Sequence, residues 1–283
     1  MAICHGVSFH RRSAVTGTSI LLTIEKNLVE QVVDIARRAG DAIMTIYATD
    51  FAIDTKDDRS PVTAADQAAE DVILAAIETQ IARVIPVVSE EAASVGQIPV
   101  VDEKPFWLVD PMDGTKEFIN HNGEFTVNIA LIEQHTPILG VVHLPTQGTT
   151  FIGYAAGASI VRDGGTWERI TCRPQPDAGL TALVSRSHHN SEVDDFLKEL
   201  TVHEEISAGS SLKFCRVAEG IADIYPRLGR TMEWDTAAGH GVLKFAGGQV
   251  RQINGKELTY GKPGFKNPYF VAASDDVFDR LIY

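Results

Sequence analysis

The most informative stretch of this 283-residue chain reads Phe106-Trp107-Leu108-Val109-Asp110-Pro111-Met112-Asp113-Gly114-Thr115. Its first four residues are apolar, as in a buried strand, and they run directly into two carboxylates. Pro111 fixes one backbone dihedral and disfavours a helix, so we expect a rigid turn that aims both carboxylates and the Met112 carbonyl to one side. Gly114-Thr115 provides the backbone expected of an anion-binding turn. Ligands for a hard cation next to a phosphate cradle indicate phosphate-ester chemistry.

Two shorter acidic motifs accompany this stretch elsewhere in the chain. Ser89-Glu90-Glu91 follows the β-branched run 84–88, which predicts a strand, and Trp234-Asp235 precedes several small residues. An isolated acidic pair is more often a solvated strand end, and an isolated Asp is a good helix N-cap. Active-site ligands usually lie on loops at strand ends, however, and Glu90 comes first after its strand. The candidate metal ligands are therefore Glu90, Asp110, Met112 (through its carbonyl), Asp113 and Asp235.

Three other residues have a functional interpretation beside a structural one. Asp66 lies three residues after Thr63, in the first turn of a predicted helix, where capping and the helix dipole favour an acid. Its functional alternative is a hydrogen bond with the Thr115 hydroxyl. Lys213 lies at a predicted helix start and is either a solvated lysine or an anion contact. His188 follows a predicted strand, and nothing in its spacing indicates metal ligation. Sequence spacing alone does not choose between these alternatives.

The composition excludes several classes of protein. A formal net charge of −13 argues against wrapping a nucleic-acid polymer or lying on an anionic membrane, because both need a basic surface. Small anionic substrates remain compatible, since bound Mg²⁺ reverses the local charge. The three dispersed cysteines favour a reducing cytoplasm over a disulfide framework or a thiolate zinc site. No apolar run approaches transmembrane length, and Ile20-Leu21-Leu22 is too short for a secretory signal.

Apolar spacing predicts an α/β protein with two lobes. Residues 1–26 are interpreted as an extension, 27–180 as an α+β lobe that binds metal and phosphate, and 181–283 as an α/β lobe that contributes Asp235 and nucleotide contacts. Helices are expected over 28–47, 63–81, 191–200, 211–219, 236–245 and after Ser274. Strands are expected over 84–88, 106–109, 126–132, 138–143, 150–154, 182–184, 222–225 and 270–272, the third to fifth forming an antiparallel succession.

In these motifs the chain resembles the inositol monophosphatase-type superfamily of Mg²⁺-dependent, Li⁺-sensitive phosphatases. The superfamily pattern is an acidic pair after one strand, D-P-(apolar)-D-G-T after the next, and W-D before small residues, and all three occur here in that order. Within it, the chain is similar to 3′(2′),5′-bisphosphate nucleotidases of the CysQ type. Inositol phosphatases typically carry D-G-T-T-N-F where this chain has Lys116-Glu117-Phe118. The supporting segments are 60–66, 113–119, 122–129, 209–215 and 234–240.

The resemblance implies a layered αβαβα sugar-phosphatase fold and a role for each motif. It assigns a first Mg²⁺ to Glu90, Asp110 and the Met112 carbonyl, and a second to Asp110, Asp113 and Asp235. A third, weaker ion is expected near Glu90. Met112 stands where Leu or Ile is usual, a difference without effect if only its carbonyl binds the metal. The catalytic residues that it implies for orienting the attacking water are Asp66, Thr115 and Glu90. The substrate-binding residues that it implies are Asp113, Gly114, Thr115, His188, Gly209, Lys213 and Asp235.

The implied activity is hydrolysis of 3′-phosphoadenosine 5′-phosphate to AMP and phosphate, with the sulfated analogue as a second substrate, in sulfur assimilation and nucleotide recycling. A water activated by Mg²⁺ attacks phosphorus in line, and the protein supplies positioning and charge neutralisation. A cytoplasmic monomer or homodimer is expected, with peripheral association at the inner membrane left open. The alternatives are an inositol monophosphatase or fructose-1,6-bisphosphatase of the same fold, and a non-enzymatic acidic metal-binding module, although no EF-hand loop occurs.

Overall fold

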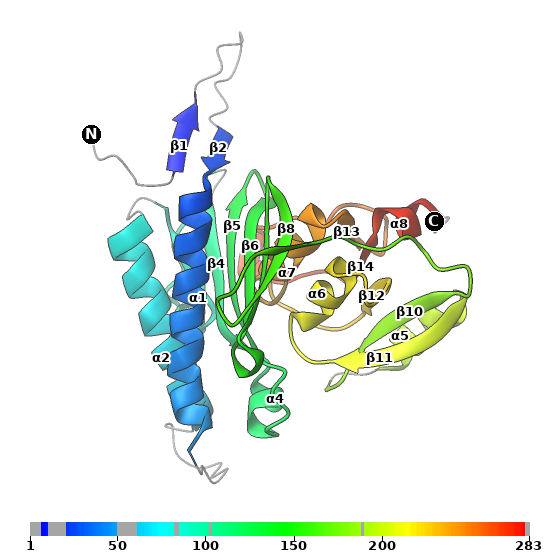
Figure 1. The fold of residues 1–283 in the computed structure, drawn as a ribbon, viewed down its shortest axis with the longest axis horizontal. Helices are drawn as coiled ribbons and strands as arrows, with labels where there is room; N and C mark the ends of the chain where they lie inside the picture. Colours follow the sequence, from blue (N-terminus) through cyan, green and yellow to red (C-terminus); the bar gives the residue numbers. More distant parts are fainter. Residues whose placement is uncertain are drawn as a thin grey trace.

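A computed structural model describes residues 7–10, 21–49, 61–81, 85–101, 104–187 and 190–280. Helices and sheets alternate through it in five layers, which confirms the expected αβαβα class (Figure 1). The layers are a helix pair, a seven-stranded sheet, a second helix pair, a five-stranded sheet and a third helix pair. The helix pairs are α1 (Lys26–Tyr47) with α2 (Pro61–Ala76), α6 (Leu212–Ala218) with α7 (Trp234–Phe245), and α5 (Ser191–Lys198) with α8 (Asp275–Arg280).

The seven-stranded sheet follows chain order from β3 to β9. β3 runs parallel to β4, and all later neighbours are antiparallel, as predicted for the succession 126–132, 138–143 and 150–154; the strands β8 and β9 that continue it were not predicted. The strands are β3 (Val87–Ser89), β4 (Phe106–Asp113), β5 (Thr126–Glu133), β6 (Thr136–Leu144), β7 (Thr149–Tyr154), β8 (Gly157–Arg162) and β9 (Glu168–Ile170). β5 is buried along its whole length because helices cover both faces of the sheet. Ile129 and Leu131 pack with the α1–α2 layer, whereas Ala130 and Ile132 pack with the α6–α7 layer.

The five-stranded sheet has the order β11-β10-β12-β14-β13. β10 is parallel to both of its neighbours, and β14 is antiparallel to both of its own. The strands are β10 (Leu180–Ser185), β11 (Val202–Ala208), β12 (Ile224–Arg227), β13 (Gly248–Gln252) and β14 (Phe270–Ser274). The sequence patterns did not predict the two edge strands, β11 and β13. Both are rich in polar residues, as an exposed sheet edge favours, so neither shows the apolar alternation of a half-buried strand.

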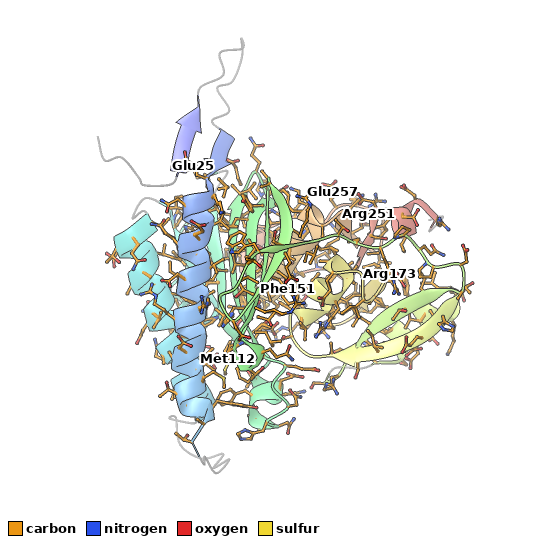
Figure 2. The ribbon with its side chains drawn as sticks, viewed as in Figure 1. Glu25, Met112, Phe151, Arg173, Arg251 and Glu257 are labelled. Carbon is orange, nitrogen blue, oxygen red and sulfur yellow. The ribbon has the colours of Figure 1, made fainter. Side chains whose placement is uncertain are left out.

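The chain passes from the first sheet to the second between β9 and β10. Arg173 lies within this connection (Figure 2). It forms a bidentate ion pair with the buried Asp223, with both N–O distances at 2.8 Å. Between the two sheets lies the largest hydrophobic cluster formed by the described residues, to which Phe151 and Phe270 belong. The proposed lobe boundary between 180 and 181 falls at the start of β10. That boundary stays a prediction, because the central cluster is shared by both lobes.

A separate two-stranded element precedes these layers. β1 (Val7–His10) pairs antiparallel with β2 (Leu21–Ile24), which leads into α1. Both strands fall within the stretch interpreted as an extension, and they carry no functional claim. α2 continues into a π-helical turn at Ile77–Ile81, so the helix expected over 63–81 is present with a wider last turn.

Helix α7 crosses the seven-stranded sheet at very short range because glycines meet at the crossing. A Cβ placed on Gly140 of β6 would lie 2.2 Å from the Ala238 carbonyl oxygen, and one on Gly153 of β7 would lie 2.4 Å from that of Gly241. Any larger side chain would force the helix away from the sheet, since protein interiors have little free space. Because α7 begins at Trp234–Asp235, this crossing sets the position of the Asp235 carboxylate.

Gly140→Ala is expected to destabilise the protein by about 3 kcal/mol, at the upper end of the cost of overpacking, because the clash is with backbone. Urea unfolding followed by circular dichroism measures the change in the free energy of unfolding. Gly165→Ala, on an exposed turn, is the matched control, since a Cβ there meets only the Arg162 carbonyl oxygen, at 3.1 Å. Equal unfolding free energies for the two variants would contradict a close-packed crossing.

Candidate metal and phosphate site

The central acidic motif lies on a bulged strand end, not on the turn that its proline suggested. β4 continues through the motif to Asp113, and its register against β5 shifts between Asp110 and Asp113. Asp110 lies opposite Asn128 and Asp113 opposite Thr126, so two residues of β4 face a single residue of β5. Pro111 explains the irregularity because it has no N–H to donate to the ladder. The bulge turns both carboxylates toward the α7 side of the sheet edge.

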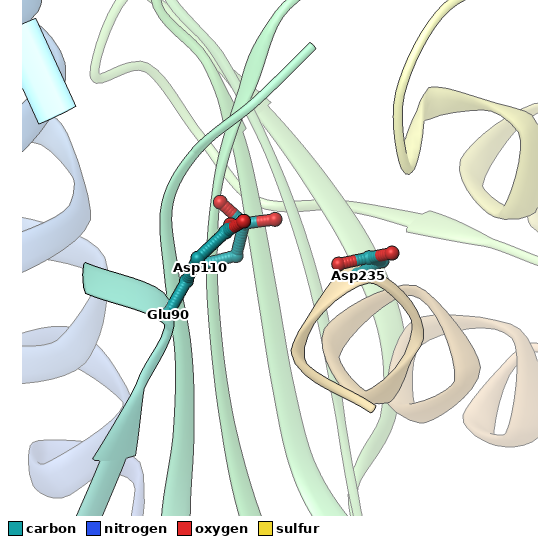
Figure 3. A group of neighbouring side chains, drawn as sticks. All are labelled: Glu90, Asp110 and Asp235. Carbon is teal, nitrogen blue, oxygen red and sulfur yellow. The ribbon is translucent and has the colours of Figure 1, made fainter. Parts of the chain in front are cut away.

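Three carboxylates from distant parts of the chain converge at this edge. Glu90 is the first residue of α3 (Glu90–Ser94), directly after β3, and Asp235 lies in the first turn of α7. Each of Glu90, Asp110 and Asp235 offers an oxygen within 4.8 Å of the other two. Figure 3 shows Glu90 and Asp110 side by side at the strand ends, facing Asp235 across a narrow gap. Residues from both sides of the predicted lobe boundary therefore contribute to one acidic cluster.

Burial and mutual repulsion make these carboxylates poor acids. Burial raises the pKa of Asp110 well above its usual value, and the neighbouring Glu90 and Asp113 charges raise it further. Burial, followed by the charge of Asp113, raises the pKa of Glu90 to about 7 and that of Asp235 to about 8. The protein alone thus disfavours the fully charged cluster at neutral pH. A bound divalent cation would reverse that preference.

The donor set fits a hard cation. All of the converging atoms are carboxylate oxygens, which Mg²⁺ and Ca²⁺ prefer over nitrogen and sulfur ligands. Opposite ligands of octahedral Mg²⁺ lie about 4.2 Å apart, so oxygens within 4.8 Å need only a small closure to share one ion. Met112, whose carbonyl belongs to the predicted ligand set, is buried in the bulge, and its amide donates to the Asp110 Oδ1 at 3.1 Å.

Asp113 is tied to the cluster through Ser211, a residue that the sequence patterns did not assign to the site. The Ser211 Oγ lies 3.1 Å from the Asp113 Oδ2 and 2.6 Å from the Asp235 carbonyl oxygen. It also accepts a hydrogen bond of 3.0 Å from the Asn128 Nδ2, and Thr126 donates to the Asn128 Oδ1 at 3.2 Å. A buried polar chain thus connects β5 to both metal-ligand candidates. Two consecutive serines before an apolar helix were the only sequence signal for it.

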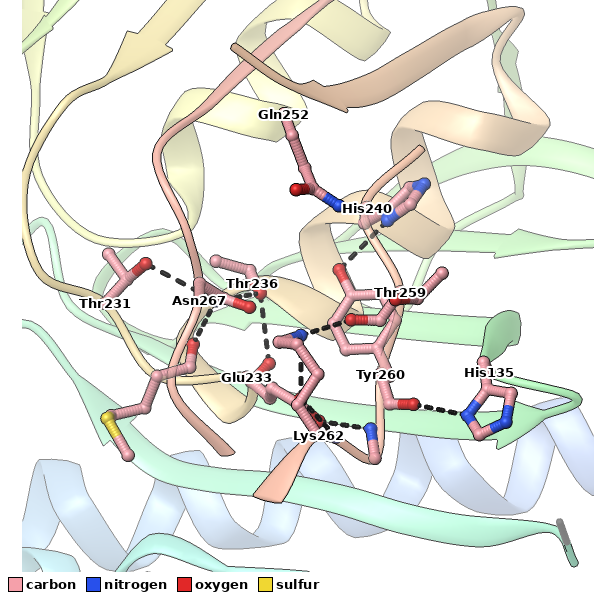
Figure 4. Close-up of polar contacts among 12 residues, drawn as sticks. His135, Thr231, Glu233, Thr236, His240, Gln252, Thr259, Tyr260, Lys262 and Asn267 are labelled. Atoms are coloured by element: carbon pink, nitrogen blue, oxygen red, sulfur yellow. Dashed lines mark hydrogen bonds and ion pairs between the residues drawn. The ribbon is translucent and has the colours of Figure 1, made fainter. Parts of the chain in front are cut away.

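A second buried polar network fixes the turn that carries Asp235 (Figure 4). The Met232 amide donates to the Asp235 Oδ2 at 2.8 Å, while the Met232 carbonyl accepts from the Asn267 Nδ2 at 2.7 Å. Glu233 is fully buried and accepts the backbone amides of residues 261–262 at 2.6 and 2.9 Å. These contacts fix the start of α7, and thereby the Asp235 carboxylate, before any ligand binds.

The residues expected to bind phosphate follow the bulge directly. Gly114 has a φ of +104°, in the left-handed region that favours glycine, and a Cβ there would lie 3.1 Å from the Phe125 Cα. Thr115 then begins the short helix α4 (Thr115–Ile119). Both residues line a cavity of about 380 Å³ that also reaches the acidic cluster. The first amides of a helix have no intrahelical acceptor, so this backbone can donate to an anion in the cavity.

Asp66 lies close enough to interact electrostatically with the cluster. It is buried on α2, and burial, with the charges of Glu91 and Glu90, raises its pKa to about 8. Within the described residues no hydrogen bond joins Asp66 to Thr115, so the expected pairing of these two side chains stays a prediction. Glu70, one turn further along α2, accepts the Ala92 amide at 3.1 Å and ties α2 to α3.

The chain from residue 25 to 276 matches the family described as the inositol monophosphatase family. The chain belongs to that family. It is 47% identical over 247 residues to the 3′(2′),5′-bisphosphate nucleotidase CysQ of Salmonella typhimurium, a match that covers 86% of this chain and 98% of that protein. It is 45% identical over 246 residues to CysQ of Escherichia coli K12, with 86% and 98% covered.

Solved structures of the family share this fold. CysQ from Bacteroides thetaiotaomicron superposes with a TM-score of 0.76 at 36% sequence identity, covering 88% of this chain and 97% of that chain. An inositol monophosphatase from Anabaena superposes with a TM-score of 0.72 at 25% identity, covering 90% and 94%. The resemblance inferred from the motifs is therefore confirmed. The family is metal-dependent, and the Glu90–Asp110–Asp235 group is where this member could hold a metal.

The second lobe of this family member supplies a basic wall to the cavity. Lys213 lines it from α6, and its Nζ donates to the Ser210 carbonyl at 2.6 Å and to the Ala208 carbonyl at 3.3 Å. Arg227 and Arg230 line it from the end of β12 and the loop beyond, and they also line an adjoining hollow of about 590 Å³. The sequence patterns missed both arginines, although they lie in a short basic stretch just before the third acidic motif.

Gly209 and His188 are the remaining residues that were predicted to contact the nucleotide. Gly209 is not among the residues that line the cavity; a Cβ on it would lie 2.6 Å from the Glu117 Cγ, so it permits close approach between the lobes. His188 lies outside the described residues, and its role stays a prediction. No described helix has both the length and the apolar character that a bilayer crossing requires.

Proposed function

We propose that this protein is a Mg²⁺-dependent 3′(2′),5′-bisphosphate nucleotidase that converts 3′-phosphoadenosine 5′-phosphate to AMP and phosphate. The observation that carries the proposal is a single cavity whose lining includes Glu90, Asp110 and Asp235 together with Lys213, Arg227 and Arg230. A substrate with two separate phosphates satisfies both sets of residues, because one phosphate needs bound cations and the other needs cationic side chains. The CysQ nucleotidase of Salmonella typhimurium, 47% identical along nearly its whole length, supports the same substrate.

The acidic end is proposed to hold the 3′-phosphate through two ions, with a third, weaker one near Glu90. Bound Mg²⁺ supplies an activated water and neutralises charge on the phosphoryl group. The first site is assigned to Glu90, Asp110 and the Met112 carbonyl, and the second to Asp110, Asp113 and Asp235. These residues also orient the phosphoryl group by fixing where the ions bind.

The chain's own contribution to the reaction is positioning and proton handling. The amides of Gly114 and Thr115 donate to phosphoryl oxygens, where negative charge must be stabilised. Asp66, with its pKa raised to about 8, together with Thr115 or Glu90, orients the attacking water and takes its proton at a carboxylate oxygen. As the new bond to phosphorus forms, the bond to O3′ breaks, O3′ takes a proton from solvent water, and the carboxylate returns its proton to solvent, giving AMP and phosphate.

The basic wall is proposed to bind the 5′-phosphate. Arg227 and Arg230 line both the cavity and the adjoining hollow, and the Arg227 Nη2 donates to the Arg230 carbonyl at 3.1 Å, so the two residues lie side by side there. Lys213 is buried, and its amine already binds two carbonyls of its own loop, so its contribution to the phosphate is largely electrostatic. Gly209 contributes by allowing the lobes to approach, and His188 remains a proposed nucleotide contact. The sulfated analogue presents the same groups and is a proposed second substrate.

Arg227→Ala is expected to raise the KM for the bisphosphate nucleotide about tenfold or more, since a charged hydrogen bond is lost, while kcat changes little. Initial rates of phosphate release measure both constants. Turnover of p-nitrophenyl phosphate, which has no second phosphate, should be unaffected by the substitution. Arg162→Ala is the control, because that arginine forms only an exposed ion pair with Glu168. An unchanged KM in Arg227→Ala would remove Arg227 from the phosphate site.

A phosphate-release panel tests the proposed function as a whole. The purified protein, with Mg²⁺ and with or without Li⁺, is offered the bisphosphate nucleotide, inositol 1-phosphate and fructose 1,6-bisphosphate at equal concentrations. Preferential release from the nucleotide supports the proposal, whereas preference for either sugar phosphate supports the rival activity of the same fold. Metal-dependent turnover of any substrate excludes a purely metal-binding module. We also propose that the protein is cytoplasmic and that it is a monomer or a homodimer.

A further inference from the structure

Two carboxylates of the first lobe reach across to loops of the second lobe that border the cavity. One of them is Glu124, in the connection between α4 and β5. It binds Arg186, which follows β10, in a bidentate pair, with Oε2 2.9 Å from Nε and Oε1 2.8 Å from Nη2. Its Oε2 also accepts the Gly209 amide, which follows β11, at 2.7 Å. A single side chain therefore holds the ends of two neighbouring parallel strands.

The other carboxylate is Glu117, in the first turn of α4. It is buried and accepts a hydrogen bond of 2.5 Å from the Ser187 hydroxyl. The adjacent Lys116 donates to the Ser187 carbonyl at 3.4 Å. Helix α4 begins at Thr115, directly after the phosphate-binding turn, so these contacts tie the segment after β10 to the reactive end of the cavity.

Gly209 is the point at which both carboxylates meet the second lobe. A Cβ on this residue would lie 2.6 Å from the Glu117 Cγ and 3.0 Å from the Glu124 Cβ, so the two side chains enclose it. The next residue, Ser210, has a φ of +43°, and its hydroxyl oxygen lies 3.2 Å from the Thr126 hydroxyl oxygen. Its carbonyl accepts from the Lys213 Nζ at 2.6 Å. The position of the Lys213 amine thus depends on a loop that the first lobe holds in place.

Charge distribution favours a positioning role over direct contact with the substrate. An unpaired carboxylate beside an anionic ligand would repel it, but both carboxyls of Glu124 and Glu117 are engaged by groups of the second lobe. Burial lowers the pKa of the Lys213 amine to about 8. The negative charges of Asp113, Glu117 and Glu124 act in the opposite direction and favour the protonated amine. The two glutamates therefore support both the position and the charge of Lys213.

We infer that Glu117 and Glu124 are positioning residues for substrate selection: they hold the segments 185–187 and 209–213 against the metal-binding lobe, so that the second-phosphate side of the cavity is formed before substrate arrives. The inference rests on the proposed function. A bisphosphate nucleotide, which spans both ends of the cavity, depends on this preorganisation. A small phosphate monoester needs only the acidic end and does not.

Kinetics of Glu124→Ala and Arg186→Ala, with two substrates, test the inference. Each variant is expected to raise the KM for the bisphosphate nucleotide about tenfold, to keep its kcat within threefold, and to leave kcat/KM for p-nitrophenyl phosphate unchanged. Because the two residues act as one pair, the double variant should be no weaker than Glu124→Ala alone. Glu124→Gln should recover part of the affinity, since its amide oxygen can still accept the Gly209 amide. Glu168→Ala, which removes an exposed ion pair, is the matched control.

The outcomes separate this inference from the proposed function. An unchanged nucleotide KM in Glu124→Ala, or equal losses for both substrates, would overturn the positioning role while leaving the nucleotidase activity established. Additive losses in the double variant would show that the two residues act separately, and would also overturn it. A wild-type protein that hydrolyses inositol 1-phosphate but not the nucleotide would refute the proposed function, and this inference with it. Glu117→Gln, in which the amide oxygen can still accept from Ser187 but the charge near Lys213 is lost, should raise the nucleotide KM by less than Glu124→Ala does, and a wild-type KM would overturn the part of the inference that assigns a role to the Glu117 charge.

Discussion

Asp235→Asn is expected to lower kcat for the bisphosphate nucleotide by about 10³-fold while the protein stays folded. Asp235 is the one member of the acidic cluster contributed by α7, so the substitution removes a negatively charged ligand from the proposed second metal site. Losing one preorganised group that stabilises the transition state costs about 10²–10³ in rate. The asparagine side-chain oxygen can still accept the Met232 amide, so the turn before α7 should be preserved.

Three measurements test the expected effects of Asp235→Asn. Steady-state kinetics give kcat, a Mg²⁺ titration followed by calorimetry gives the metal affinity, and thermal unfolding in EDTA gives the stability. Mg²⁺ affinity should fall, whereas metal-free stability should rise because one buried carboxylate is gone from a repulsive group. Asp195→Asn, on the exposed face of α5, serves as the matched control. Wild-type turnover by Asp235→Asn at ordinary Mg²⁺ would eliminate the second-metal assignment.

The metal-free protein is expected to lose stability as the pH rises from 6.5 to 8. Asp66, Glu90 and Asp235 have folded-state pKa values of about 8, 7 and 8, against ordinary values of 3.8, 4.5 and 3.8. In this window the folded state still holds protons that the unfolded state has already released, so each increase in pH favours unfolding. The buried His143 and His240, whose pKa values burial lowers from 6.5 to about 4 and about 3, act in the opposite direction, but within this window their effect is smaller and fades above pH 7, where an unfolded histidine has lost most of its proton.

Thermal unfolding in EDTA across this range should show a fall in Tm of roughly 5 °C or more, given about 2–4 °C for each kcal/mol in a protein of this size. Millimolar Mg²⁺ should raise the Tm, most strongly at pH 8, because it binds the charged carboxylates of the folded state. Asp235→Asn should show a shallower fall than the wild type. A Tm in EDTA that stays level from pH 6.5 to 8 would mean that the carboxylates do not repel one another as the structure indicates.

Local sequence patterns were informative wherever function rests on neighbouring residues. Asp110, Asp113 and Gly114 lie within five positions, so their spacing alone predicted ligands beside a phosphate turn. The turn that the same motif predicted was wrong. Pro111 disrupts strand pairing without ending the strand, and β4 continues through the motif with a bulge. Whether proline produces a turn or a bulge depends on the partner strand, β5, which is not part of the motif.

Residue patterns and motif spacing did not predict contacts between residues that lie far apart in the sequence. The Ser211 side chain contacts Asp113 and the Asp235 carbonyl only because α6 packs beside α7. The residues around Ser211 in the sequence do not predict that packing. In the sequence, nothing distinguishes Arg227 and Arg230 from arginines on any surface. They are candidate phosphate contacts only because β12 and the loop after it place them at the cavity. Glu124, likewise, has a partner 62 positions away.

The sequence by itself determined the type of ligand atoms, the kind of ion they suit and the order of the helices and central strands. These follow from residue chemistry and from backbone preferences that act over a few neighbouring positions. The tertiary structure alone decided that Glu90, Asp110 and Asp235 converge to within 4.8 Å, and that a basic wall faces them. That convergence depends on how closely α7 approaches the sheet through Gly140, and such a distance arises from packing between layers, which no local pattern encodes.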